Sequence, residues 1–226
     1  MDADIAPVAA LIAEPARAAM LNALVGGRAL AAGELARLAG VSAPTASSHL
    51  AKLLDGGLVE VVRQGRHRYY RLAGHEIAEV LETLSRISNR PAVRSLKQSR
   101  EARRLEEART CYDHLAGRAG VGLLDGMVAQ GYLLGGELSE RGEQVLTELD
   151  VDVPGARRAR RHFAPECIDW TERRAHLGGA LGAALTRAML ASGWIEPGSS
   201  PRAVVVTERG REGLATWFAC KELTSP

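Results

Sequence analysis

The stretch that decides the fold is Val41-Ser42-Ala43-Pro44-Thr45-Ala46-Ser47-Ser48-His49-Leu50-Ala51-Lys52-Leu53. Ser42 is a favourable N-cap, and Pro44 in the first turn lacks an N–H that a helix would leave unpaired in any case. A short helix is expected over residues 32–39, and it ends at the turn Gly40-Val41. The pattern predicts two helices joined by a tight turn, which is the core of a helix-turn-helix.

The residues on either side of this pair complete a small domain. Upstream, apolar residues at helical spacing predict a first helix over 11–24. Downstream, the period changes and predicts a hairpin over 58–72 with its turn at Gln64-Gly65. A last helix is expected over 75–87. We therefore predict a winged helix-turn-helix domain over residues 1–90.

Two groups of residues in this domain have the chemistry of a DNA interface. The second helix of such a motif enters the major groove, and the small polar residues near its start would meet the base edges. From Arg63 to Arg71 the hairpin carries several basic residues with no acid between them, which suits contacts with phosphates. We expect double-stranded promoter DNA to be contacted by Ser42, Ala43, Pro44, Thr45, Ser47, Ser48, Lys52, Arg63, Arg66, His67 and Arg68.

The same segments resemble the ArsR/SmtB family of bacterial repressors, whose pattern is close to S-x-P-T-V-S-x-H-L-x-x-L, then G-L-V, then G-R-x-x-Y-Y-R-L. Here the three parts are Ser42–Leu53, Gly57-Leu58-Val59 and residues 65–72, and the resemblance covers about residues 8–88. It implies a homodimer joined through the first and last helices of the domain. It also implies an operator with two half-sites and release from DNA when an inducer binds.

The chain departs from this family at several positions. Ser48 stands where the family often has His or Arg, and Ala51 where it often has Lys, so the operator sequence is not implied. The helix around 34–39 lacks the Cys-x-Cys of the family's best-known metal site. His75 begins the last helix, but Arg86 stands near the place of the second His of another family site. The inducer site is therefore expected elsewhere in the chain.

The remainder of the chain contains an internal repeat after a polar connecting helix over 91–110. His114–Leu123 aligns with His176–Leu185, and Ser139-Glu140-Arg141-Gly142 aligns with Thr207-Glu208-Arg209-Gly210. We expect a mainly α fold with small β wings (α+β), in which the winged helix-turn-helix is followed by two degenerate winged-helix-like repeats. These form a sensor and dimerisation region over 111–226, with the repeats at 111–153 and 167–220.

Cysteine and histidine residues recur at comparable places in the two repeats. Cys111 and His114 are spaced i,i+3, which predicts that they share a helical face or a helix entry turn. Pseudo-twofold packing would bring Cys167 and His176 to the same place and create a Cys2His2 metal site. We expect the inducer to be a thiophilic ion such as Zn(II), Cd(II), Pb(II) or As(III), with Cys220 and His162 as possible further ligands.

Other interpretations of the same residues stay open. Buried cysteines often only pack, and Asp113 and Asp169 are compatible with simple N-caps. A thiol switch would need Cys111 and Cys167 to lie close together. A small organic inducer between the repeats is a further alternative, in a pocket lined by Tyr112, Tyr132, Trp170 and Trp194.

Composition excludes several classes of protein. The chain has 226 residues, of which 46% are hydrophobic and 25% charged, with a net charge of +2. This is a globular balance, and the charge alone does not indicate nucleic acid. There is no Gly-x-Ser-x-Gly elbow, P-loop or His-Glu-x-x-His motif, so we expect no enzyme. The acidic start, the lack of a long apolar run and the sparse cysteines favour a cytoplasmic protein with no membrane partner.

Overall fold

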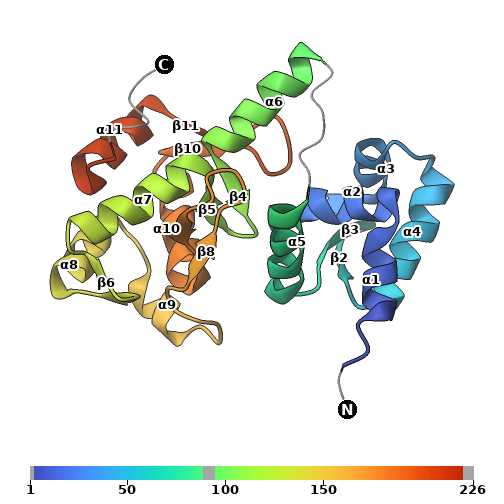
Figure 1. Cartoon of the computed structure of the whole chain (residues 1–226), viewed down its shortest axis with the longest axis horizontal. Coiled ribbons are helices and arrows are strands. Elements are labelled where there is room, and N and C mark those ends of the chain that lie inside the picture. Colours follow the sequence, from blue (N-terminus) through green and yellow to red (C-terminus); the bar gives the residue numbers. More distant parts are fainter. Residues whose placement is uncertain (1–2, 89–94, 221–226) are drawn as a thin grey trace. The chain divides into compact units, whose positions relative to one another are not determined.

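The computed structural model describes residues 3–88 and 95–220, and the chain divides into two compact units, residues 1–84 and 85–226 (Figure 1). Within the described ranges, no helix has both the length and the apolar character needed to cross a membrane. The helix α5 crosses the boundary between the units.

The first unit packs its helices on a three-stranded sheet of order β1-β3-β2. The expected pair of helices is α3 and α4, and Gly40 joins them in the left-handed conformation, with a φ of +67°. Leu35 of α3 and Leu50 of α4 are fully buried, together with Met20 and Leu24 of α2. The elements are α1 (Ala6–Ala13), α2 (Pro15–Leu24), β1 (Leu30–Ala31), α3 (Ala32–Ala39), α4 (Ala43–Asp55), β2 (Val59–Gln64), β3 (His67–Leu72) and α5 (His75–Ile87).

The helix predicted over 11–24 is in fact two helices. The residue before a proline is disfavoured in the α region, and Glu14 has φ −78° and ψ 127° before Pro15. The Glu14 carboxylate accepts hydrogen bonds from the N–H groups of Ala16 and Arg17. Glu14 therefore ends α1 and caps α2, and the chain turns between them.

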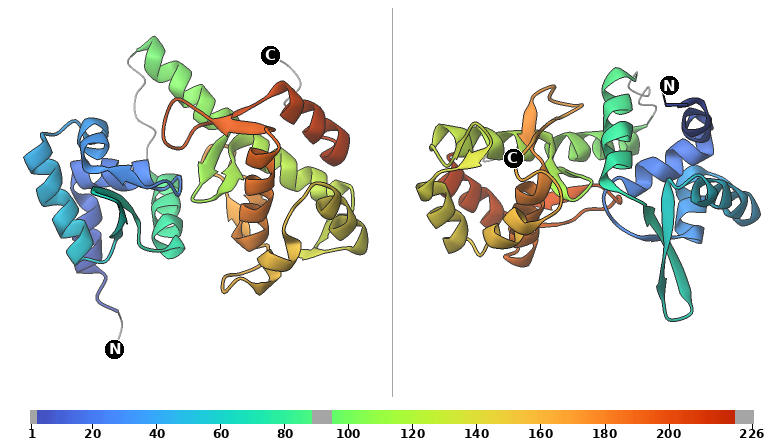
Figure 2. Two further views of the ribbon diagram at one scale, coloured as in Figure 1. Left: turned by 180° about the vertical axis from the view of Figure 1, so that it is seen from behind. Right: turned by 90° about the horizontal axis from the view of Figure 1, so that it is seen from below.

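The strands β2 and β3 form the expected wing. They pair antiparallel from Val59↔Leu72 to Gln64↔His67, and Gly65 at the turn has a φ of +58°. The hairpin extends away from the helices of its own unit (Figure 2, right). β1 pairs with β3 at the base of the wing, where Tyr70 is buried.

The second unit contains the same order of elements twice, as a hairpin, a helix, a second hairpin and a second helix. The first copy follows α6 (Leu96–Glu107) and consists of β4 (Arg109–Cys111), β5 (His114–Ala116), α7 (Gly117–Ala129), β6 (Leu133–Leu134), β7 (Glu137–Leu138) and α8 (Glu140–Glu148). The second follows α9 (Val153–Arg158) and consists of β8 (Glu166–Ile168), β9 (Ala175–Leu177), α10 (Gly179–Ala191), β10 (Ile195–Pro197), β11 (Val204–Val206) and α11 (Glu208–Phe218).

Equivalent contacts recur in the two copies. Ser139 Oγ accepts the N–H of Gly142 at 3.0 Å, and Thr207 Oγ1 accepts that of Gly210 at 3.0 Å. A Cβ at Gly142 would lie 2.2 Å from the carbonyl oxygen of the aromatic residue before β6. At Gly210, the corresponding distance before β10 would be 1.9 Å. The repeated Ser/Thr-Glu-Arg-Gly motif is thus a helix cap that packs tightly on the preceding chain.

The two copies pack reciprocally in the core of the second unit. α7 contacts β9 of the second copy, α10 contacts β5 of the first copy, and β5 and β9 lie against each other. The backbone N–H of Leu115 donates to Thr186 Oγ1 at 2.9 Å, which ties β5 to α10. Leu181 and Phe218 are fully buried in the shared core. The first hairpins of both copies therefore meet at the centre of the unit.

Candidate nucleic-acid interface and Cys/His cluster

The start of α4 presents a polar surface on the first unit. Ser42 Oγ accepts the N–H of Thr45 at 3.4 Å, and the two hydroxyls lie 2.8 Å apart. Ala46 and Leu50 are buried, which fixes the face that α4 turns to its own domain. The other face is exposed and holds all the helix residues predicted to contact DNA: Ser42, Ala43, Pro44, Thr45, Ser47, Ser48 and Lys52.

The outer part of the wing is positively charged. Arg63 and Arg68 are opposite one another in the register of β2 and β3. Arg71, nearer the base, forms an ion pair with Glu60 across the hairpin, so its charge is compensated. The predicted wing residues are all exposed: Arg63, Arg66, His67 and Arg68.

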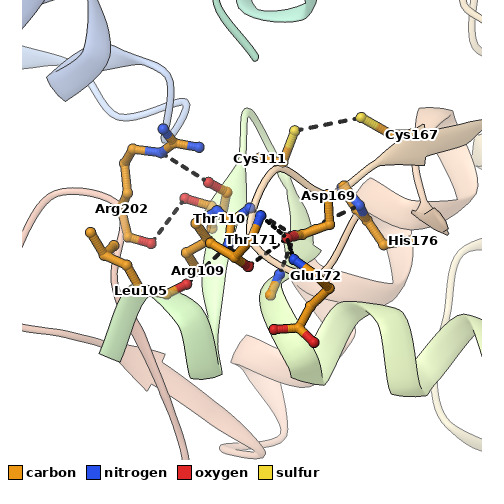
Figure 3. Close-up of polar contacts among 11 residues, drawn as sticks. Leu105, Arg109, Thr110, Cys111, Cys167, Asp169, Thr171, Glu172, His176 and Arg202 are labelled. Carbon is orange, nitrogen blue, oxygen red and sulfur yellow. Dashed lines mark hydrogen bonds and ion pairs between the residues drawn. The ribbon is translucent and has the colours of Figure 1, made fainter. Parts of the chain in front are cut away.

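Four side chains converge at the centre of the second unit. Cys111 of β4 pairs with His114 of β5, and Cys167 of β8 pairs with His176 of β9. One ligand atom from each of the four lies within 4.8 Å of all the others. The two sulfur atoms are 3.8 Å apart (Figure 3). The structure thus brings together all four residues predicted as metal ligands.

The local structure around Cys111 and His114 is a β-hairpin, whereas the sequence predicted a shared helical face or a helix entry turn. The two residues are cross-strand neighbours on either side of the turn Tyr112-Asp113, and Tyr112 takes a φ of +58° there. A longer loop, residues 169–174, separates the second Cys–His pair. Cross-strand pairing depends on register and not on loop length, so unequal spacings give equivalent pairs.

The cluster is a buried and polar environment. The rings of His114 and His176 stack with centroids 5.1 Å apart, and none of their four nitrogens has a hydrogen-bond partner. The neighbouring Cys111 thiol and the two histidines lower the pKa of the Cys167 thiol. Burial disfavours the charged form of His114, but Asp113 and Cys167 outweigh burial and raise the pKa of its ring. Both shifts favour the charged forms, a thiolate at Cys167 and a protonated ring at His114.

A carboxylate lies beside each histidine of the cluster. Asp113 Oδ1 is 3.6 Å from His114 Nδ1, and Asp169 Oδ2 is 4.0 Å from His176 Nδ1. Each aspartate follows its cysteine by two positions, so the sequence Cys-x-Asp recurs in the two hairpins. From the sequence alone these aspartates are compatible with simple N-caps, and they were not among the expected site residues. The repeated spacing was the signal that could have identified them as part of the site.

Each carboxylate is in turn bound by an arginine that the sequence did not single out. Arg161 donates to both oxygens of Asp113, at 3.1 and 2.8 Å. Arg109 is fully buried and donates to Asp169 Oδ2 at 2.7 Å (Figure 3). Burial disfavours the charged form of Asp169, but Arg109 and several N–H and O–H donors outweigh it and hold the pKa of that carboxyl well below its ordinary value.

The two further candidate ligands lie outside the cluster. Cys220 is buried against α7, where a Cβ at Gly122 would lie 2.5 Å from its sulfur. His162 is exposed, and its carbonyl oxygen accepts the N–H of Ala180. Among the described residues, neither belongs to the group of side chains whose donor atoms could hold one ion.

A separate cavity of about 250 Å³ lies between helices of the two copies. Trp194 and Trp217 line this cavity. Trp194 is one of the four aromatic residues that the sequence suggested for an organic-ligand pocket. The polar and charged side chains that line this cavity are Glu148, Asp150, Ser192 and Arg209. Tyr112, Tyr132 and Trp170 are not part of this lining.

The chain is similar to known transcriptional regulators. Residues 12–62 match the family model of a helix-turn-helix domain. The uncharacterized HTH-type transcriptional regulator YdfF of Bacillus subtilis (strain 168) is 43% identical over 215 residues, which is 93% of this chain and 95% of the relative.

Two solved structures are similar to part of the chain. One is the homodimeric winged helix-turn-helix domain Mb0332 from Mycobacterium bovis, described as a possible ArsR-family regulator. It is 34% identical to this chain. The match covers 35% of this chain and 73% of the Mb0332 chain, with a TM-score of 0.33. The other is the cadmium metal-sensor CMTR from Mycobacterium tuberculosis. It is 30% identical to this chain. The match covers 41% of this chain and 99% of the CMTR chain, with a TM-score of 0.33.

The match to the Bacillus regulator spans both units, and the winged first unit carries the sequence pattern of the ArsR/SmtB repressors. The chain therefore belongs to the family of HTH-type transcriptional regulators, with a winged helix-turn-helix of the ArsR/SmtB type as its DNA-binding part.

Proposed function

We propose that this regulator is a repressor that binds promoter DNA through α4 and the wing, and leaves it when a metal ion occupies the cluster of Cys111, His114, Cys167 and His176. The observation that carries the proposal is the convergence of two sulfur and two nitrogen donors, one pair from each copy, within 4.8 Å. Thiolate and imidazole are the ligands that thiophilic metals prefer in proteins.

The DNA half of the proposal is supported by the exposed face of α4 and by the charge of the wing. Small groups such as those of Ala43 and Thr45 can approach base edges closely in the major groove. The arginines at the outer part of the hairpin suit phosphates, whose contacts supply affinity and set the register of the protein on the duplex. In this proposal α4 recognises the base sequence and the wing binds the phosphate backbone.

The geometry of the cluster suits a tetrahedral divalent ion. Zinc–sulfur bonds of about 2.3 Å at tetrahedral angles place two sulfurs about 3.8 Å apart, and Cys111 and Cys167 have this separation, 3.8 Å. Buried imidazole nitrogens without partners cost free energy, and an ion bound to His114 and His176 would remove part of that cost. Zn(II) and Cd(II) fit this set of two sulfurs and two nitrogens.

The ions that favour three thiolates are served less well by these residues. As(III) and Pb(II) would gain most from a third thiolate, and Cys220 packs against α7 outside the cluster. We therefore place Zn(II) and Cd(II) ahead of As(III) and Pb(II) as inducers.

The proposal includes a homodimer formed through α1 and α5, as the family resemblance implies. α1 is largely apolar but contains no buried residue. The large hydrophobic residues that these two helices and the start of α1 expose are Ile5, Val8, Val80, Leu84 and Ile87. A second copy of the chain would remove this apolar surface from water.

A response to thiol oxidation is the second candidate function, favoured by the 3.8 Å between the sulfurs of Cys111 and Cys167. A disulfide needs the sulfurs at about 2.05 Å, so a small shift of the two hairpins would suffice. With hydrogen peroxide as oxidant, the two thiols would lose two electrons and two protons to form the S–S bond, and the peroxide would be reduced to two water molecules.

Fluorescence anisotropy on DNA from the protein's own promoter distinguishes these functions. The reduced protein is bound to the labelled DNA, and Zn(II), Cd(II), Pb(II), As(III) or peroxide is added in separate titrations. We expect one equivalent of Zn(II) or Cd(II) per chain to release the DNA. Release by peroxide alone would favour the thiol switch, and binding that no addition disturbs would contradict both candidates.

A further inference from the structure

We propose that Asp113 and Asp169 are positioning residues of the Cys/His cluster, each of which orients one histidine and is itself held by an arginine from outside its own copy. This inference rests on the proposed metal site. It assigns to two aspartates and two arginines a role in how tightly that site binds its ion.

The aspartates face the same nitrogen of each ring. Asp113 lies 3.6 Å from Nδ1 of His114, and Asp169 lies 4.0 Å from Nδ1 of His176. These separations are longer than a hydrogen bond, but they are short enough for a small rotation of the ring to close one. A carboxylate on the Nδ1 side fixes the tautomer that carries its proton there and leaves Nε2 as the nitrogen that binds an ion.

Each aspartate is held by an arginine that lies outside its own copy. Asp113 belongs to the hairpin of the first copy, and Arg161, which holds both its oxygens, lies between α9 and β8. Asp169 follows β8 of the second copy, and Arg109, which holds it, lies on β4 of the first. Each carboxylate is therefore fixed by a residue outside its own copy, and so the orientation of both histidines depends on how the second unit packs.

The two arginine–aspartate pairs differ in solvent exposure, and this decides which pair can be tested without loss of the fold. The side chains of Arg109 and Asp169 are both 0% exposed. Removal of one would leave a buried unpaired charge, which threatens the fold itself. The side chains of Arg161 and Asp113 are 20% and 34% exposed, so variants of this pair are expected to fold.

The test is a metal titration of the full chain with Co(II), whose absorption bands report tetrahedral thiolate coordination, followed by displacement with Zn(II). The variants are Asp113→Asn, Arg161→Ala and the double variant. Asp125→Asn is the control, because Asp125 also forms a short ion pair with an arginine, Arg174, at 2.7 Å, outside the Cys/His cluster.

We expect Asp113→Asn to weaken Co(II) and Zn(II) binding about 10–100-fold, the usual effect of removing a partner of a ligating histidine. The Co(II)–thiolate absorption bands of the metal-loaded protein should be unchanged. The unfolding midpoint of the metal-free protein should also be unchanged. Arg161→Ala should weaken binding less. In the Asp113→Asn background it should add little, because the arginine acts through the aspartate.

Two results would overturn the proposal, and they are distinguishable. Equal metal affinities of Asp113→Asn and Asp125→Asn, with a normal Co(II) spectrum in the unmodified protein, would remove the positioning role and leave the metal site intact. Absence of Co(II) and Zn(II) binding by the unmodified protein would remove the metal site and the positioning role with it.

Discussion

The sulfur atoms of Cys111 and Cys167 lie 3.8 Å apart, although 56 positions separate the two residues along the chain. Each cysteine stands on the first strand of a hairpin, and each pairs directly with a histidine on the second strand. The hairpins meet because each copy packs its first helix on the other copy's hairpin. The four donor atoms therefore come together only when the two copies pack against each other. A ligand bound there would be sensitive to that packing.

The paired sulfurs lead to a first prediction about induction. Cys111→Ser combined with Cys167→Ser should abolish release of the DNA by Zn(II) or Cd(II), because a hydroxyl is a far poorer ligand for these ions than a thiolate. DNA affinity without metal should stay the same, since both residues lie in the second unit. Anisotropy titrations measure both quantities.

Cys220 provides the control for the cysteine variants, because it is a buried cysteine outside the cluster. Cys220→Ser should respond to metal as the unmodified protein does. A full response of the double variant would refute the cluster as the sensor. Loss of response in Cys220→Ser alone would move the sensor to the end of α11.

A second prediction concerns the wing. Arg66→Ala or Arg68→Ala should weaken binding to all DNA sequences to a similar degree, because phosphate contacts carry no sequence information. Each loss should reduce the slope of log K against log salt by about 1. The measurement is anisotropy at a series of salt concentrations. Arg118→Ala, an exposed arginine of α7, is the control; an unchanged slope in the wing variants would exclude the hairpin from the interface.

The sequence predicts those parts of the fold that local patterns determine. The cap at Ser42, the turn at Gly40 and the hairpin at Gly65 could all be predicted, because each depends on neighbouring residues. The break at Glu14 was not predicted: apolar residues at helical spacing run through it, but Pro15 disfavours the α region for Glu14 and divides the helix.

The candidate site shows where local patterns cease to be sufficient. A spacing of i,i+3 suits a helical face and a tight hairpin equally, so Cys111 and His114 were expected together but on the wrong element. The pair Arg109 and Asp169 is separated by 60 positions, and its partner choice is made by the packing of the copies. The internal repeat predicted that the donors would meet, but not the residues that hold them.

A third prediction tests the dimer. Val8→Glu or Val80→Glu would place a charge on the apolar surface of α1 or α5, and a charge without a partner is costly to bury in an interface. We expect the dimer dissociation constant to rise about tenfold or more in sedimentation equilibrium, a change of about 1.4 kcal/mol. Glu79→Lys changes the charge at an exposed position of α5 and should leave the constant nearly unaltered. Equal behaviour of all three variants would place the interface elsewhere.

The last prediction uses the glycines of the repeated motif. In an ordinary helix, Gly→Ala stabilises by up to about 1 kcal/mol. At Gly142 and Gly210, however, the new Cβ would lie 2.2 and 1.9 Å from a carbonyl oxygen, so the backbone must move. We expect Gly142→Ala and Gly210→Ala each to lower the free energy of unfolding by about 1–3 kcal/mol, as overpacking does. Urea denaturation measures this loss. Gly33→Ala on α3 is the matched control, because no atom lies within 4 Å of its Cβ position, and it should be neutral or slightly stabilising. If only one of the two motif glycines proved sensitive, the copies would not share the close helix contact that their common sequence indicates.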